Sequence, residues 1–339
     1  MAARATRSAS RKARATEAVA TGPLGALSHD ELGVIFDGLA DPLEPVVAVA
    51  LSSTCLGLRT PLRAALEVLK ERHARAKALC RKMPWTQPLM SCTELRDAEI
   101  LDWGSRGLTA DDLATLSMIL RTNGLPRLLR LYLDRNCFGD AGMQALCEGL
   151  GPGAAPALRT LHLFSNEFGP VGAEALAAAL RWGAMPSLAM LHMGGNPIGN
   201  QGVVTLVAPL RKMPELRDLY LSFCQVGDEG VASLVVNLGK DEFKKLEALY
   251  LDNNKTTRAG GETLAAAVNG NAFPSLIGID IRRNDMSDDD EKALKAKLER
   301  VWPFDHGVDS EDDDDSEDDD ASEDDNVDDE EEGVGDVGL

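Results

Sequence analysis

Aromatic residues are scarce in this chain of 339 residues, which has only 3 Tyr, 4 Trp and 8 Phe. Hydrophobic residues still make up 44% of it, so a core must be built from Leu, Ala and Val. Long apolar runs are missing too. The longest candidate, Val46 to Leu51, is far shorter than the roughly 20 residues that cross a bilayer. The composition predicts a globular protein without a membrane span.

Cysteine pairs and enzyme motifs are also missing. None of the six cysteines forms a C-x-x-C pair, and their spacing suits neither a zinc site nor a disulfide framework. The chain has no nucleotide-binding loop of the Walker or G-x-G-x-x-G type and no nucleophile elbow. We therefore expect reduced thiols, no catalysis by this chain alone, and no cofactor or bound metal. The cysteines are Cys55, Cys80, Cys92, Cys137, Cys147 and Cys224.

The acidity of the chain is confined to one end. The formal net charge is −20, but residues 309–336 hold 19 Asp and Glu and no Lys or Arg. Without them the charge is about −1, so the body is nearly neutral. A neutral body argues against nucleic-acid binding by a basic face.

The sequence repeats itself from Ala98 onward. The pattern L-x-x-L-x-L-x-x-N recurs at steps of 30 residues, with one step of 28. Leu or Val follows ten and fourteen residues after each Asn, and a spacing of four indicates one face of a helix. The repeats start at residues 98, 128, 158, 188, 216, 246 and 276.

The start of each helix also has a regular pattern. A glycine stands six residues after the Asn position in five copies, where we expect it to let the helix pack closely on the turn. Polar residues precede these helices and are predicted to be their N-caps. The glycines are Gly142, Gly172, Gly202, Gly230 and Gly260, and the predicted caps are Asp140, Asn200, Asp228 and Asp288.

This pattern resembles the leucine-rich repeat of the ribonuclease-inhibitor type, over about residues 91–304. The resemblance implies an α/β solenoid of about seven repeats, with short parallel strands on a concave inner face and helices outside. Neither half of a repeat can bury its apolar face alone, so the repeats must stack. Leu219 and Leu249 are predicted to point into the shared core. The resemblance gives the repeated asparagines, and Cys224 in one such place, a structural role.

Alternate residues of a strand point to opposite faces, so the residue between the last two Leu positions must point out of the core. That column contains five successive rings and all three tyrosines, and we interpret it as a partner-binding stripe. Two alternatives remain: the rings only cover the sheet, or His162 and His192 bind a metal, although no third ligand is evident. The predicted partner-binding residues are Tyr132, His162, His192, Tyr220, Tyr250, Asp134, Arg135, Phe164, Phe223, Asp252, Arg282 and Arg283.

The chain before the repeats divides into two parts. Residues 1–22 are basic and predicted to be disordered. They suit an organelle transit peptide, a nuclear or anionic-surface tail, or a terminus without an address. Residues 23–90 are predicted to form three helices: one with Leu32, Ile35, Phe36 and Leu39 after an N-cap at Ser28, one over 46–58 and one over 61–83.

Residues 24–62 resemble an F-box module. The stretches L-S-H-D-E-L-G-V-I-F-D-G-L and V-A-V-A-L-S-S-T-C-L-G-L-R carry the likeness, although Ser28 or His29 stands in the place of the usual Pro, and Leu58 in that of the Trp. The resemblance implies docking of residues 23–62 on a Skp-type adaptor of a ubiquitin ligase, with the repeats recruiting substrate. The alternative is a helical cap that shields the edge of the first repeat.

Residues 305–339 form an acidic tail that is predicted to be disordered. Ser310, Ser316 and Ser322 each precede three acidic residues, which suits an acidophilic kinase of the casein kinase 2 type. A tail of this kind after such repeats is similar to Ran GTPase-activating proteins. The sequence thus predicts a non-enzymatic interaction scaffold in the cytoplasm or nucleus, with organelle import left open. The alternative is a Ran-type activator that binds a small GTPase.

Truncation after Val308 is expected to leave the melting temperature almost unchanged, because a nearly neutral body does not need the tail to fold. The truncated chain should bind basic partners more weakly at low salt, since exposed charges are screened within about 10 Å at 0.1 M salt. Thermal denaturation of both forms checks the first expectation. A large loss of stability would mean that the tail folds back onto the body.

Overall fold

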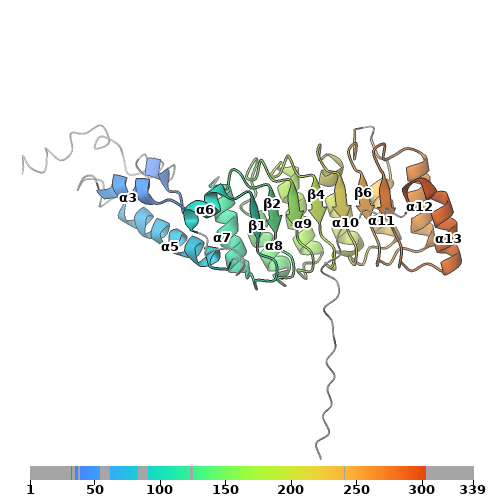
Figure 1. The fold of residues 1–339 in the computed structure, drawn as a ribbon, viewed down its shortest axis with the longest axis horizontal. Helices are drawn as coiled ribbons and strands as arrows, with labels where there is room; N and C mark the ends of the chain where they lie inside the picture. Colours follow the sequence, from blue (N-terminus) through green and yellow to red (C-terminus); the bar gives the residue numbers. More distant parts are fainter. Residues whose placement is uncertain are drawn as a thin grey trace, which may run out of the picture. The chain divides into compact units, whose positions relative to one another are not determined.

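A computed structural model describes residues 32, 35–36, 39–53, 62–82, 91–122, 125–239 and 241–302 (Figure 1). The predictions on residues 1–22, Ser28, Cys55 and the acidic tail lie outside them. The chain divides into two units, residues 1–304 and 305–339, and the first is described here. Its elements are α3 (Val46–Ser53), α5 (Arg63–Cys80), α6 (Cys92–Asp97), β1 (Ile100–Asp102), α7 (Ala110–Arg121), β2 (Arg130–Tyr132), α8 (Gly139–Cys147), β3 (Thr160–His162), α9 (Pro170–Arg181), β4 (Met190–His192), α10 (Gly199–Arg211), β5 (Asp218–Tyr220), α11 (Asp228–Val235), β6 (Ala248–Tyr250), α12 (Arg258–Asn269), β7 (Gly278–Asp280), α13 (Asp288–Lys297) and η2 (Glu299–Val301).

The strands form one parallel sheet in the order of the sequence, from β1 to β7. Each strand pairs with the next one in the register of the repeat, so that Leu219 lies opposite Leu191 and Leu249. The helices α7 to α12 pack each against the next one along one side of the sheet. This arrangement confirms the predicted α/β solenoid. None of the helices in the described ranges covers the other side of the sheet, here called the open face (Figure 1).

The middle residue of every strand belongs to the core. Leu219 is 0% exposed and Leu249 is 1% exposed, so the predicted direction of both side chains is confirmed. In the degenerate first repeat, Leu101 and Trp103 are both fully buried in the same cluster. Because each strand has only three residues, one buried side chain separates two that belong to the open face.

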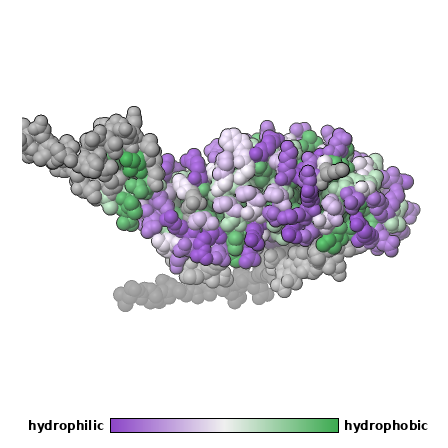
Figure 2. Space-filling view, turned by 90° about the horizontal axis from the view of Figure 1, so that it is seen from above, coloured by the Kyte–Doolittle hydropathy of each residue, from purple (hydrophilic) through white to green (hydrophobic). Residues whose placement is uncertain are grey.

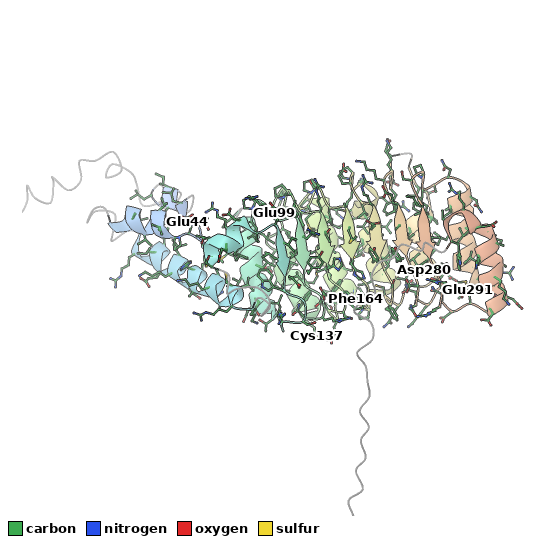
Figure 3. The ribbon with its side chains drawn as sticks, in the orientation of Figure 1. Glu44, Glu99, Cys137, Phe164, Asp280 and Glu291 are labelled. Carbon is green, nitrogen blue, oxygen red and sulfur yellow. The ribbon has the colours of Figure 1, made fainter. Side chains whose placement is uncertain are left out.

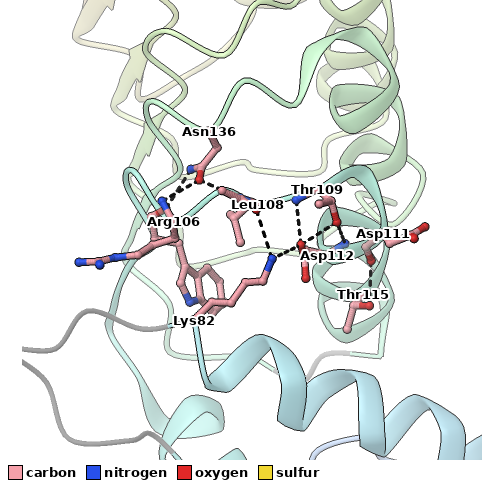
Figure 4. Close-up of polar contacts among 10 residues, drawn as sticks. Lys82, Arg106, Leu108, Thr109, Asp111, Asp112, Thr115 and Asn136 are labelled. Atoms are coloured by element: carbon pink, nitrogen blue, oxygen red, sulfur yellow. Dashed lines mark hydrogen bonds and ion pairs between the residues drawn. The ribbon is translucent and has the colours of Figure 1, made fainter. Parts of the chain in front are cut away.

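The repeated asparagines satisfy backbone groups at the turn of the preceding repeat. Asn136 Oδ1 accepts hydrogen bonds from the backbone N–H groups of Arg106 and Leu108, both at 3.0 Å (Figure 4). Its Nδ2 donates to the carbonyl of Trp103 at 2.9 Å. Cys224 takes this place in one repeat, and its thiol donates to the carbonyl of Met193 at 3.3 Å. Burial raises the pKa of Cys224 to about 12, so the thiol keeps its proton.

The predicted N-caps do not cap their own helices, so this prediction is wrong. Asp140 lies inside the first turn of α8, and its Oδ1 accepts from the N–H groups of Gly169 and Gly172 at the start of α9. Asn200 caps α11 in the same manner, and Asp228 accepts from Thr257 before α12. These side chains therefore cap the helix of the next repeat, because the helices stack in parallel. Ser287, and not Asp288, is the N-cap of α13.

The glycines at the helix starts have the expected packing role. A Cβ atom on Gly142 would lie 2.5 Å from Cβ of Phe138, and one on Gly260 would lie 2.3 Å from Oδ1 of Asp228. Both distances are below van der Waals contact, so a larger residue would push apart the turn and the cap from the preceding repeat.

The long helix α5 connects the helices before the repeats with the core of the repeats. The third predicted helix, over 61–83, corresponds to α5, which is slightly shorter. The second, over 46–58, corresponds to α3, which is described only to Ser53. Leu69 of α5 packs with Leu32 and Phe36, whereas Leu79 belongs to the core of the repeats. Lys82 then pairs with Asp112 of α7 at 2.6 Å and donates to the carbonyl of Gly107 (Figure 4). The helical segment is therefore packed onto the first repeat.

Among the helices that the structure describes, none is both long enough and apolar enough to cross a membrane.

Candidate partner-binding face

The register of the sheet places the five predicted rings side by side on the open face. Tyr132 lies opposite His162, His162 opposite His192, and so on through Tyr220 to Tyr250. We call these five residues the ring ladder. The predicted order of this column is confirmed by the strand pairing, and Asp102 and Asp280 occupy its two ends.

The ladder rings touch one another and are half-buried, where an exposed column was expected. The centroids of Tyr220 and Tyr250 lie 4.2 Å apart with an angle of 5° between the rings, and the other neighbours are 4.7 to 5.1 Å apart. Each ring hides the faces of its neighbours, so mainly edges and polar tips are left for contact. The ladder therefore covers the sheet and also offers a continuous surface, and the two interpretations of the sequence do not exclude each other.

Phe164 widens the ladder because the next repeat has no side chain in its way. Its ring, labelled in Figure 3, stacks on His192. The centroids lie 5.2 Å apart with 25° between the planes. A Cβ atom on Gly194 would lie 3.2 Å from this ring, and one on Gly195 would lie 3.3 Å from it. The two glycines thus make room for Phe164. Gly194 and Gly195 follow His192 by two and three residues, and the sequence pattern gave no sign of this role.

The two histidines in the centre are neutral near pH 7. His162 Nδ1 and His192 Nδ1 lie 3.4 Å apart, a distance at which one ring can donate to the other. Burial, and then the proximity of His162, lower the pKa of His192 to about 3. Burial also lowers the pKa of His162, although Asp134 and Asp102 oppose it. Within the described ranges, no group of three His, Cys, Asp or Glu side chains is arranged to hold a metal ion.

We expect His192 to make the fold sensitive to acid. A folded-state pKa below the unfolded value of about 6.5 means that the unfolded chain binds the proton more tightly, so stability falls as the pH drops from about 6.5 toward 3. Between pH 7 and pH 5 this loss should amount to about 1–2 kcal/mol. His192→Gln should remove that part of the loss, as urea denaturation at both pH values would measure. Equal losses in the two proteins would contradict the assigned burial of this ring.

The tyrosine pair keeps its phenolic protons and is surrounded by carboxylates. Burial is the main cause that raises the pKa of both Tyr220 and Tyr250, and Asp218 contributes to each. Asp252 also raises the pKa of Tyr250, and it accepts a hydrogen bond from Ser222 Oγ at 2.5 Å. The part of the ladder on β5 and β6 therefore presents phenol groups and carboxylate acceptors side by side.

The remaining predicted residues border the ladder. Arg135 lies over the ring of Phe164, with its guanidinium carbon 5.9 Å from the centroid. Phe223 is 53% exposed, and Arg283 is also exposed. Arg135, Phe223 and Arg283 belong to a column whose residue has a positive φ in every repeat, a feature that the sequence reasoning missed. The column is Ser105, Arg135, Ser165, Gly195, Phe223, Asn253 and Arg283, with φ between 51° and 69°.

A comparison with protein-family models agrees with the repeats of the fold. The family model described as "Leucine Rich repeat" matches residues 126–147, 155–177 and 212–235. Among solved structures, the chain is similar to an internalin from Listeria monocytogenes with 16% sequence identity and a TM-score of 0.36. The similarity covers 67% of this chain and 66% of the internalin chain, so it spans just under two thirds of that protein. A search of curated proteins gives no match.

Proposed function

We propose that this leucine-rich-repeat solenoid is a non-enzymatic scaffold that binds a protein partner on the open face of its sheet. The observation that carries the proposal is the ring ladder. All three tyrosines of the chain and two of its five histidines stand in this one column, bordered by Phe164 and Phe223. Tyrosine and arginine dominate binding hot spots because they combine a large rigid area with a polar tip.

The helix side of the solenoid is the other surface on which a partner could bind. The helices on the other side show single exposed apolar residues, such as Trp182 at the end of α9 and Val204 on α10. Isolated residues of this kind are normal on a surface, whereas a contiguous set is not. Stacked repeats also use their inner surface for binding, because it presents one row of side chains per repeat.

Affinity capture with the full chain, followed by mass spectrometry, tests this function. The same capture should be run with Tyr220→Ala/Tyr250→Ala and with Trp182→Ala as a control on the helix side. A specific partner should be retained by wild type and by the control, and lost with the tyrosine variant. If the tyrosine variant retains every partner, the ladder only covers the sheet.

An adaptor-binding role for the helical segment is the finer part of the proposal. Figure 2 shows apolar surface over this segment. The large apolar side chains exposed there are Ile35 by 36%, Leu39 by 38%, Val46 by 68%, Val47 by 54%, Val49 by 40% and Val68 by 47%. Val46 also borders a cavity of about 490 Å³ beside α6. An F-box-type segment would use such residues to dock on a Skp-type adaptor. Pull-down of the adaptor by the full chain, lost in Val46→Asp/Val47→Asp and kept in Val204→Asp, would support this role.

A Ran-type GTPase activator is the alternative function. It rests on the repeats together with the acidic tail, and none of the ladder residues is assigned a part in GTP hydrolysis. Faster GTP turnover by a Ran-like GTPase in the presence of the full chain would favour this alternative over an adaptor-linked receptor.

We further expect the tail to be phosphorylated at Ser310, Ser316 and Ser322. Each serine has acidic residues at the next three positions, which suits a kinase of the casein kinase 2 type. Incubation with such a kinase should add up to three phosphates, and a triple Ser→Ala variant should take up none. Labelling that persists in the triple variant would place the modification elsewhere.

A further inference from the structure

The two ends of the ring ladder are built alike. At one end Tyr132 is followed two residues later by Asp134, and Asp102 of the outer strand lies beside Tyr132. At the other end Tyr250 is followed two residues later by Asp252, and Asp280 lies beside Tyr250. Asp280 is labelled in Figure 3. Both ends thus consist of a tyrosine ring, a carboxylate two residues after that tyrosine and a carboxylate on the terminal strand.

At the β7 end this arrangement already holds a guanidinium group. Arg282 donates from Nε to both carboxylate oxygens of Asp280, at 3.0 and 3.1 Å, and from Nη2 at 2.5 Å. The bond to Asp280 is the main cause that raises the pKa of Arg282, and Asp252 adds to it. The bidentate geometry and the second carboxylate are typical of an arginine site.

The β1 end lacks this cation. The residue that corresponds to Arg282 there is Gly104, two positions after Asp102. The local backbone is the same, because the N–H of Gly104 donates to Asp102 Oδ1 at 3.0 Å, as that of Arg282 does to Asp280 at 3.0 Å. Asp102 and Asp134 form no ion pair with any residue in the described part of the chain. Arg135, next to Asp134, lies over the ring of Phe164, and its charge acts on Asp134.

Burial places Asp134 in an unfavourable environment for a charged carboxylate. Burial raises the pKa of Asp134 and the nearby charge of Asp102 adds to the rise, while a hydrogen bond from its own backbone and the charge of Arg135 oppose it only in part. The outer side of the Tyr132 ring faces β1, where no aromatic ring follows it. A cation placed there would meet two carboxylates and the ring of a tyrosine, a combination that favours guanidinium and ammonium groups.

We propose that Asp102, Asp134 and Tyr132 form a subsite for a positively charged side chain, an arginine or lysine, of the protein that binds the open face. The partner's cation would take the place that Arg282 fills at the other end of the ladder. This inference rests on the proposed function of the face, and it names the chemistry of the partner residue that is recognised.

A titration with a small probe tests the subsite without the partner. N-acetyl-arginine amide is added to the full chain labelled with ¹³C in the rings of its tyrosines, and N-acetyl-citrulline amide serves as a neutral probe of nearly the same shape. The chain has only three tyrosines, so each signal is assignable. The arginine probe should shift Tyr132 with a Kd of about 1–10 mM, leaving Tyr220 and Tyr250 in place.

Two variants sharpen the test. Gly104→Arg supplies the missing guanidinium from the chain itself and should abolish the shift of Tyr132. Gly104 has no positive φ, and its Cβ would lie 2.8 Å from the mobile end of Asp134, which can move aside. Asp134→Asn should weaken binding at least tenfold, whereas the matched Asp252→Asn at the filled end should not. Equal shifts with both probes, or an unchanged titration in Gly104→Arg, would overturn the subsite.

The captured partner separates this inference from the proposed function. If Gly104→Arg and Asp134→Asn weaken its binding about tenfold or more, the subsite is used in the complex. If binding is lost in the Tyr220→Ala/Tyr250→Ala variant but unchanged in these two, the proposed function stands and the subsite fails. If neither set of variants changes binding, the proposed function itself fails.

Discussion

Replacing Tyr220 and Tyr250 together by alanine is expected to weaken partner binding by about 2 kcal/mol or more, which is roughly thirtyfold. The centroids of the two rings, on β5 and β6, lie 4.2 Å apart. Both phenols keep their protons, because burial and the nearby Asp218 raise their pKa. Their removal deletes a rigid, amphipathic area and two hydrogen-bonding groups at once. Isothermal titration calorimetry with the purified partner measures the loss.

The stability of this variant must be measured beside its affinity. Each tyrosine stands between core residues that stay in place, so the fold should lose about 1–2 kcal/mol, mainly the ring contact. Half-burial of the rings makes this cost larger than that of an exposed column. Trp182→Ala, which removes an exposed ring at the end of α9, is the matched control and should change neither quantity. Unchanged affinity in a well-folded double variant would contradict the role of the ladder.

Leu249→Ala is expected to cost the fold about 2–5 kcal/mol through lost burial and a cavity that the neighbours cannot close. Leu249 is 1% exposed, and the strand register places Leu219 on one side of it and Ile279 on the other. A defect in the middle of a stack affects two interfaces between repeats. Chemical denaturation of the full chain gives the free energy of unfolding.

Val204→Ala is the control for this core variant, because Val204 on the outer side of α10 is 40% exposed. It should cost less than about 1 kcal/mol. A cost of that size for Leu249→Ala as well would mean that the strands are assigned to the wrong face.

The fold could be predicted from the sequence because one signal recurs seven times. A period of 30 residues fixes which leucines share a face, and the strand register follows from the period alone. The same period places Tyr132, His162 and Tyr250 in one column, as the strand pairing confirms. Here each repeat confirms the others, and an error in one copy would appear as a break in the pattern.

The contacts between repeats could not be predicted in this way. Asp140 was expected to cap its own helix, since sequence proximity suggests a local partner, but it caps α9 across the repeat boundary. The fit of Phe164 over Gly194 and Gly195 likewise depends on side chains about thirty residues apart. The likeness of the two ladder ends depends on the hydrogen bonds between Arg282 and Asp280, which the sequence pattern does not reveal. Period and pattern give positions, whereas side-chain partners depend on the packed geometry.

Photo-crosslinking tests the central claim, that the partner binds the open face, most directly. A benzophenone amino acid is placed at Phe223, which is 53% exposed beside the ladder, or at Trp182, which is 69% exposed at the end of α9. Both positions hold an exposed aromatic residue, so the probe disturbs each to a similar degree. The account predicts a crosslink to the captured partner from position 223 and none from position 182. A crosslink from position 182 alone would place the partner on the helices and contradict the account.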